Sequence, residues 1–84
     1  MVRITRKVAS QGSTLMIEGK LQGQAVQVLR NECRTDLENG TRVTLDLSGV
    51  TYVDENGIRL LRRLAQDRVQ ITHCSALVAE LFGV

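Results

Sequence analysis

Near the N-terminus, apolar and polar side chains alternate with a period of two. In residues 2–8, Val2, Ile4 and Val8 share one side of an extended chain, and Arg6 interrupts that side. Residues 14–19 alternate in the same way. Such alternation is typical of a half-buried strand. The intervening residues 10–13 favour a turn, so the two stretches predict an antiparallel hairpin.

After Gly23 the pattern changes to a helical period. Apolar side chains recur every three or four residues, which predicts a helix with one buried face. The residues of that face are Ala25, Val26, Val28, Leu29, Cys33 and Leu37. The pair Asn39-Gly40 is typical of a helix C-terminus. The same period returns in residues 57–66, where the apolar side chains are Ile58, Leu60, Leu61, Leu64 and Ala65.

The remaining chain completes an alternation of strands and helices. Residues 42–47 predict a third strand, residues 48–56 a polar connection, and residues 68–73 a fourth short strand. Ser75 is a suitable N-cap for a last short helix. The order strand, strand, helix, strand, helix, strand, helix predicts an α/β fold. We expect a single domain over residues 1–84, with helices packed against a mixed four-stranded sheet.

Composition limits the classes of protein to which this domain can belong. The chain has 84 residues, a net charge of +2 and only two aromatic residues, so its core must be aliphatic. No apolar run approaches the ~20 residues of a membrane helix. Residues 1–20 lack the apolar segment of a signal peptide. We therefore expect a cytoplasmic protein without direct membrane insertion.

The residues that carry out catalysis are poorly represented. An enzyme needs a nucleophile beside a base, or carboxylates that face each other across a cleft. The adjacent Asp54 and Glu55 diverge on an extended chain, and the single histidine, His73, has no acid or nucleophile placed beside it. Cys33 and Cys74 are expected to be free thiols and lack further ligands at zinc spacing. We expect no catalysis, no metal and no cofactor.

The most specific stretch of the chain is residues 45–58, LDLSGVTYVDENGI. It resembles the signature of the STAS domain, the fold shared by bacterial anti-sigma factor antagonists and the cytoplasmic tails of sulfate transporters. Residues 18–21 and the final helix also resemble parts of that family, and the resemblance covers essentially the whole chain. It implies a small domain that binds proteins in bacterial signalling and transcription regulation.

The chain departs from the family at its regulatory position. In the best-understood antagonists, a serine follows the aspartate of this motif, and a partner anti-sigma factor kinase phosphorylates that serine. Here the aspartate matches Asp54, the switch position is Glu55, and the next residue, often Ser, is Asn56. Phosphorylation at position 55 is therefore impossible.

Two interpretations of Glu55 stay open. The residue precedes the predicted helix from Gly57, where unpaired N–H groups and the helix dipole favour negative charge. A phosphoserine there would carry about −2, and Glu55 carries −1 permanently. Glu55 either imitates the modified serine and leaves the domain unswitched, or is a tolerated helix-end charge worth about 0.3–1 kcal/mol.

We expect the partner-binding surface to lie on this connection and the exposed side of the helix after it. Its residues are Ser48, Thr51, Asp54, Glu55, Asn56, Arg59 and Arg62. Asp46 is expected to fix the connection by accepting backbone N–H bonds. Gly57 is expected to allow either a close approach of the backbone or an unusual backbone dihedral angle.

The class of partner has alternatives. Residues 57–68 hold four arginines and one acid, but the aromatic residues that stack on single-stranded nucleic acid are missing, so we expect no nucleic acid partner. The resemblance implies a protein partner, such as an anti-sigma factor kinase. A different class of function is a cytoplasmic STAS subunit of a lipid or anion transporter, docked on an ATPase or a permease. Neighbouring genes would separate the two.

Overall fold

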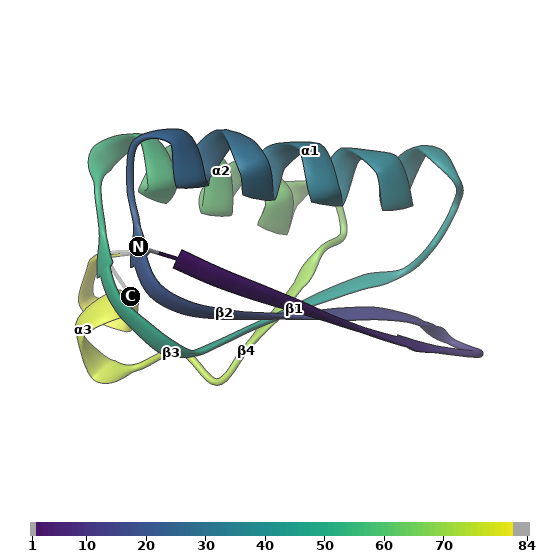
Figure 1. Cartoon of the computed structure of the whole chain (residues 1–84), viewed down its shortest axis with the longest axis horizontal. Coiled ribbons are helices and arrows are strands. Elements are labelled where there is room, and N and C mark those ends of the chain that lie inside the picture. The colour runs from purple at the N-terminus through teal and green to yellow at the C-terminus, as the bar shows by residue number, and fades with distance from the viewer. Residues whose placement is uncertain (1, 82–84) are drawn as a thin grey trace.

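The computed structural model describes residues 2–81, which form four strands and three helices (Figure 1). In chain order these are β1 (Val2–Ala9), β2 (Gly12–Leu21), α1 (Gln24–Glu38), β3 (Val43–Val53), α2 (Glu55–Gln66), β4 (Gln70–Thr72) and α3 (Ala76–Leu81). The expected order of elements is confirmed.

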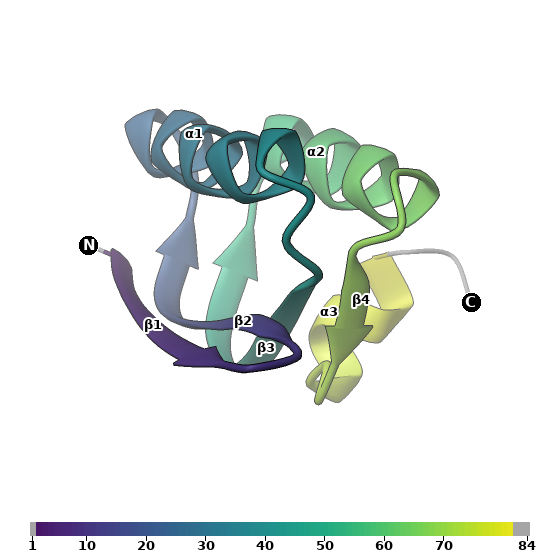
Figure 2. The same cartoon turned by 90° about the vertical axis from the view of Figure 1, so that its right-hand side faces the viewer.

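The strands form one mixed sheet in the order β1-β2-β3-β4. β1 and β2 are the expected antiparallel hairpin, and β2, β3 and β4 are parallel neighbours. α1 and α2 lie side by side over one face of the sheet (Figure 2). α3 lies apart from these two helices and packs against β3. This is the predicted α/β architecture.

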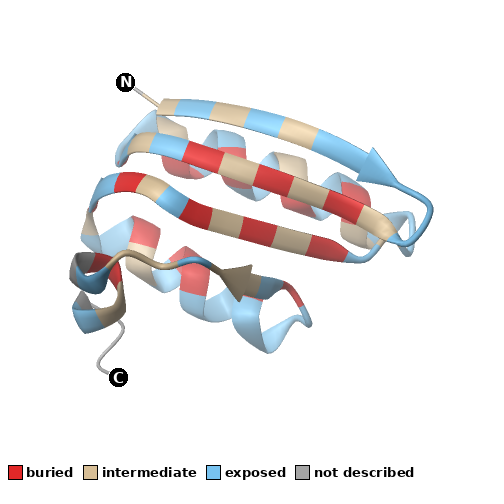
Figure 3. Ribbon diagram, turned by 90° about the horizontal axis from the view of Figure 1, so that it is seen from below, coloured by how far each residue is buried: buried red, intermediate tan, exposed pale blue. Residues whose placement is uncertain are grey.

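The core between the sheet and the helices is aliphatic. Buried residues alternate with less buried ones along β2 and the first half of β3 (Figure 3). The buried apolar residues are Leu15, Ile17, Leu21, Val26, Leu29, Cys33, Val43, Leu45, Leu47, Val50, Val53, Leu60, Leu61, Leu64, Val69 and Val78. Three residues that we assigned to apolar faces, Val8, Val28 and Ala65, are instead exposed. Val8 lies beside the hairpin turn, and the other two lie on the flanks of their helices.

β3 is longer than its alternation predicts. The expected polar connection, residues 48–56, is wrong for its first six residues, because β3 continues to Val53. β3 carries one extra residue between Asp46 and Gly49, and a second between Val50 and Tyr52, relative to β2. Such bulges shift the side chains from one face to the other. The two bulges therefore interrupt the period-two pattern of the sequence, although the strand continues.

Two other element boundaries differ from the sequence prediction. α2 begins at Glu55, two residues before Gly57, because Asp54 and not the glycine caps it. β4 is limited to Gln70–Thr72, within the predicted residues 68–73. The C-terminus of α1 is as predicted, since Gly40 follows it with a φ of 73°.

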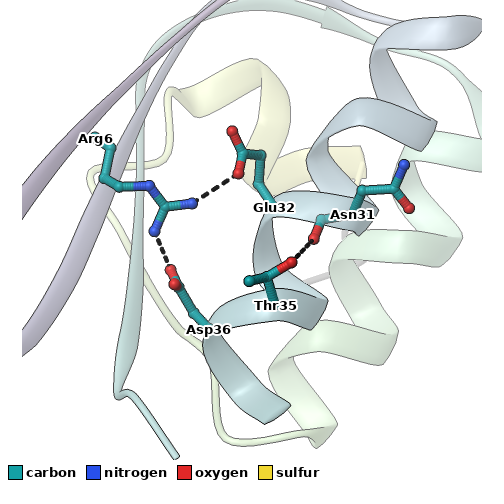
Figure 4. A network of polar contacts seen from close by, with 5 residues as sticks. All are labelled: Arg6, Asn31, Glu32, Thr35 and Asp36. Carbon is teal, nitrogen blue, oxygen red and sulfur yellow. Dashed lines mark hydrogen bonds and ion pairs between the residues drawn. The ribbon is translucent and has the colours of Figure 1, made fainter. Parts of the chain in front are cut away.

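Arg6, which interrupts the apolar side of β1, is paired with two carboxylates of α1 (Figure 4). Its Nη2 lies 2.8 Å from Glu32 Oε2, and its Nη1 contacts Asp36 Oδ2. The hydrogen bond to Asp36 raises the pKa of Arg6. Asp36 is buried, and this partner compensates the cost of placing a carboxylate in the core. The pair fastens β1 to the helical layer.

Candidate functional site

Asp54 connects two chain segments at the carboxyl ends of β2 and β3. Its Oδ1 accepts a hydrogen bond of 2.7 Å from the Gly57 N–H, which caps the first turn of α2. Its Oδ2 accepts one of 3.1 Å from the Gly23 N–H, just before α1. Its own backbone N–H donates to Leu21 O at 3.1 Å. A single carboxylate therefore fixes the beginning of α2 against the beginning of α1.

Gly57 is closely packed inside this turn. A Cβ added to Gly57 would lie 2.6 Å from Val53 Cγ1 and 3.0 Å from Leu21 O, closer than side-chain carbons normally approach. The expected close approach is thus present, and it brings the first turn of α2 directly onto the end of β2. Only glycine fits this position without a displacement of its neighbours.

Glu55 and Asn56 occupy the first turn of α2 and are exposed. The Glu55 carboxylate lies 3.8 Å from Arg59 Nη2, and the two side chains are 88% and 73% exposed. An ion pair so open to water contributes little to folding. Its charges remain available to a partner, while Asp54 holds the backbone below them.

Ser48 and Thr51 lie elsewhere on the surface, within β3 and not in a loop with Glu55. Ser48 lies in the first bulge and Thr51 in the second. Ser48 is six residues before Asp54, or about 20 Å away along an extended strand at ~3.3 Å per residue. The structure therefore separates Ser48 from the first turn of α2.

Asp46 has the structural role expected of it. Its Oδ1 accepts a hydrogen bond of 3.0 Å from the Ser48 N–H and thereby fixes the first bulge. This backbone hydrogen bond lowers the pKa of the Asp46 carboxyl. Asp46 thus shapes β3 before the turn at Asp54.

Arg59 and Arg62 are both exposed on α2, as expected. Arg59 is one turn beyond Glu55, and Arg62 follows within another turn. With Glu55 and Asn56, they form a continuous strip along the start of the helix. We call these four residues, together with Asp54 below them, the α2 surface.

Sequence reasoning missed Gly23 and Val28, which lie near Asp54, and the exposed Tyr52 on β3. Gly23 supplies the second hydrogen bond to Asp54. Tyr52, two residues before Asp54, and Val28, on α1, are large apolar side chains that are about half exposed, at 45% and 50%. Val28 and Asp54 line the same hollow of about 630 Å³. The exposed aromatic was the available signal, because tyrosine is enriched in protein interfaces.

Three further features of residues 2–81 concern metal ligands, membrane-spanning helices and cysteines. Within residues 2–81, no three His, Cys, Asp or Glu side chains gather as metal ligands would. Within the same range, none of the helices combines the length and the apolar character needed to span a bilayer. Cys33 and Cys74 are free thiols, and burial raises the pKa of both, to about 11 for Cys33.

Comparison with known proteins agrees with this geometry. The model of the family described as "Mlab, STAS domain" matches residues 4–84. The anti-sigma factor antagonist SpoIIAA in its unphosphorylated form has a similar structure. The TM-score is 0.75, and the match covers 96% of this chain and 82% of that chain at 18% identity. At this identity the likeness shows the fold alone.

A second solved structure is similar over a smaller part of its length. The crystal structure of Mglu matches with a TM-score of 0.60 and 28% identity. The match covers 80% of this chain and 18% of that one, so this chain spans less than a fifth of Mglu. No curated protein matches this chain.

Proposed function

The chain belongs to the STAS family, and from this membership we propose that it is a non-catalytic, protein-binding regulatory module similar to anti-sigma factor antagonists. We propose that residues 1–84 form one such module, that it works in the bacterial cytoplasm, and that it binds its partner through the α2 surface. The observation that carries this proposal is the turn at Asp54. Two hydrogen bonds hold that turn, so Glu55, Asn56 and Arg59 are presented on a fixed backbone.

The proposed surface has charges of both signs within one helical turn. Glu55 lies beside Arg59, and Arg62 follows on the same exposed side of α2. Charges arranged in this way orient an approaching partner and exclude partners of the wrong pattern. Because the Glu55–Arg59 pair is open to water, a partner can exchange it for its own contacts at small cost.

Glu55 gives the module a permanent charge at the position where the best-understood antagonists carry a switchable serine. A glutamate cannot gain or lose a phosphate, so the partner meets the same surface at all times. The first turn of α2 supports this carboxylate, because helix N-termini favour negative charge. We therefore propose that binding is not controlled by phosphorylation of this position.

The same observation favours a second candidate function. A subunit that stays bound to its complex needs no release signal, and a fixed charge suits it. A STAS subunit of a lipid or anion transporter, docked on an ATPase or permease, is such a case. The two candidates differ in the partner and share the α2 surface.

Affinity capture from the native cytoplasm tests this proposal. The bait proteins are the wild type, the double variant R59E/R62E, and R3E/R42E, which makes the same change of charge at two exposed positions outside the α2 surface. We expect a specific protein with the wild type and with R3E/R42E, and its loss with R59E/R62E. A kinase or phosphatase as the captured protein supports the first candidate, and an ATPase or permease supports the second. Equal capture by all three baits would contradict the claim that the partner binds through the α2 surface.

A further inference from the structure

A groove runs between α1 and α2 and is lined by residues from both helices and the residue after α2. The two helices lie next to each other there (Figure 2). The groove has a volume of about 380 Å³. The residues that line it are Arg30, Arg34, Leu60, Arg63, Leu64 and Asp67. Arg63 is next to Arg62 of the α2 surface in sequence, but none of the residues already assigned to that surface lines the groove.

The charge of the groove is strongly positive for so small a site. Arg30 and Arg34 come from α1 and Arg63 comes from α2, against the single carboxylate of Asp67. In the part of the chain that the structure describes, none of these three arginines forms an ion pair. The Nη2 of Arg34 donates to Asn31 Oδ1 at 2.9 Å, which leaves its charge uncompensated.

Two of the three carboxylates of α1 are paired away from the groove, and the third, Glu38, forms no ion pair among the described residues. Glu32 and Asp36 lie on the opposite flank of α1 and are paired with Arg6 of β1. This division of charge follows from the helical period, because residues two positions apart face away from each other. α1 therefore turns Glu32 and Asp36 toward β1 and Arg30 and Arg34 toward α2.

We propose that this groove binds an acidic segment of a protein partner, whose Asp and Glu side chains meet Arg30, Arg34 and Arg63. This inference rests on the proposed function, because it takes the partner to be a protein. Arginine presents a planar fork of donors that matches a carboxylate with two parallel hydrogen bonds. Three such groups around one groove suit several carboxylates of one chain segment.

The shape and the floor of the groove favour an acidic peptide over other anionic partners. Leu60 and Leu64 form the floor and are only 4% and 5% exposed, so they offer little apolar area to a ligand. Recognition must then be mainly polar. A membrane surface is broad and flat, whereas these arginines line a depression between two helices. No aromatic residue is present in the lining to stack on nucleic acid bases.

The test is a titration of the isotope-labelled protein with a hexaglutamate peptide, followed by NMR at low salt. We expect shifts of the backbone signals of Arg30, Arg34 and Arg63, and no comparable shifts with a hexaserine peptide. R30E/R63E should bind hexaglutamate at least about tenfold more weakly, because two attractive contacts become repulsive. R3E/R42E is the matched control and should bind like the wild type.

A milder pair of substitutions guards against loss of folding. Arg63 lies in the last turn of α2, where a positive charge favours the helix, so its reversal weakens the helix as well as the site. R30Q/R63Q keeps long side chains and should also weaken hexaglutamate binding, with an unchanged circular dichroism spectrum. Tight binding by both folded double variants would overturn the groove site.

Other outcomes separate the possible errors. Vesicles of phosphatidylglycerol or a thymidine oligonucleotide that bind the groove while hexaglutamate does not would overturn the acidic-peptide proposal. One outcome of the capture experiment above is a partner retained by R30E/R63E and lost by R59E/R62E. That result would support the proposed function and overturn the groove as a binding site. If the wild type captures no specific protein, the proposed function is contradicted, whatever the result with the peptide.

Discussion

The two hydrogen bonds of Asp54 can be separated by substitution. Asp54→Ala removes both acceptors, Oδ1 for the Gly57 N–H at 2.7 Å and Oδ2 for the Gly23 N–H at 3.1 Å. Loss of an N-cap costs about 0.5–2 kcal/mol, with a typical value near 1. A further hydrogen bond is worth about 0.5–1.5 kcal/mol, and the lower half applies here because the Gly23 contact is exposed. Together they give an expected loss in the free energy of unfolding of about 1–3 kcal/mol, and of about 1.5–2 kcal/mol with the typical cap value.

Asp54→Asn separates the contribution of the helix cap at Gly57 from that of the hydrogen bond from Gly23. Asparagine is as good an N-cap as aspartate, so its side-chain oxygen can still accept from Gly57. Its amide nitrogen then faces the Gly23 N–H, where two donors cannot bond. We expect the asparagine variant to lose about half as much stability as the alanine variant.

Urea denaturation followed by circular dichroism measures both variants, and a thermal melt gives an independent value. For a domain of this size, a loss of ~2 kcal/mol corresponds to a decrease in Tm of about 8–16 °C. Asn56→Ala, at an exposed position two residues along the chain, should stay close to the wild type. A loss below about 0.5 kcal/mol for Asp54→Ala would refute the claim that this carboxylate holds the turn.

Three further outcomes follow from the packing. Gly57→Ala should lose about 1–2 kcal/mol, because overpacking against Val53 Cγ1 at 2.6 Å outweighs the ~1 kcal/mol by which alanine favours a helix; urea denaturation measures it. Arg6→Ala should lose about 1–3 kcal/mol in the same assay, because it leaves the buried Asp36 carboxylate unpaired. Cys33 should react with a thiol reagent only when the protein unfolds, since it is fully buried and its pKa is raised to about 11.

Each of these has a control. Val53→Ala in the Gly57→Ala background removes the contacted methyl group, so the second substitution should cost less there than in the wild type. Arg3→Ala, exposed on the other side of β1, should be nearly neutral where Arg6→Ala is not. Cys74 is only partly buried and should react faster than Cys33 in the native protein. Equal rates for the two thiols would contradict the burial argument.

Hydrophobic periodicity predicted the fold well where elements are regular. The hairpin, both long helices and the order of elements follow from periods of two and of three to four residues. The second half of β3 could not be found in this way. Its two bulges each insert a residue, so Ser48 to Val53 shows no alternation although it is strand.

The Arg6 pair was within reach of sequence reasoning. A charge on the apolar side of a strand requires a partner, and Asp36 lies three residues after Cys33 on the buried face of α1. Each residue alone looks like an interruption of a pattern. Together they are one contact, which could be inferred only after β1 had been placed beside α1.

The α2 surface was predicted in part. The motif brought Asp54, Glu55 and Asn56 into the expected surface, and the helical period placed Arg59 and Arg62 on the exposed side. Ser48 was grouped with them because the connection was expected to be a loop. The contact between Asp54 and Gly23 joins residues 31 positions apart, and no local pattern contains that information.

The order of strands leaves β1 as an outer edge of the sheet, eight residues long and with one row of backbone groups unpaired. Exposed edges of this length tend to join edges of other molecules. In an antiparallel pairing of two copies centred on Thr5, Arg3 of each copy would face Lys7 of the other. Like charges directly opposite each other destabilise such a pair. The cations of β1 thus discourage aggregation of the domain through its longest free edge, and this protection should weaken as salt rises.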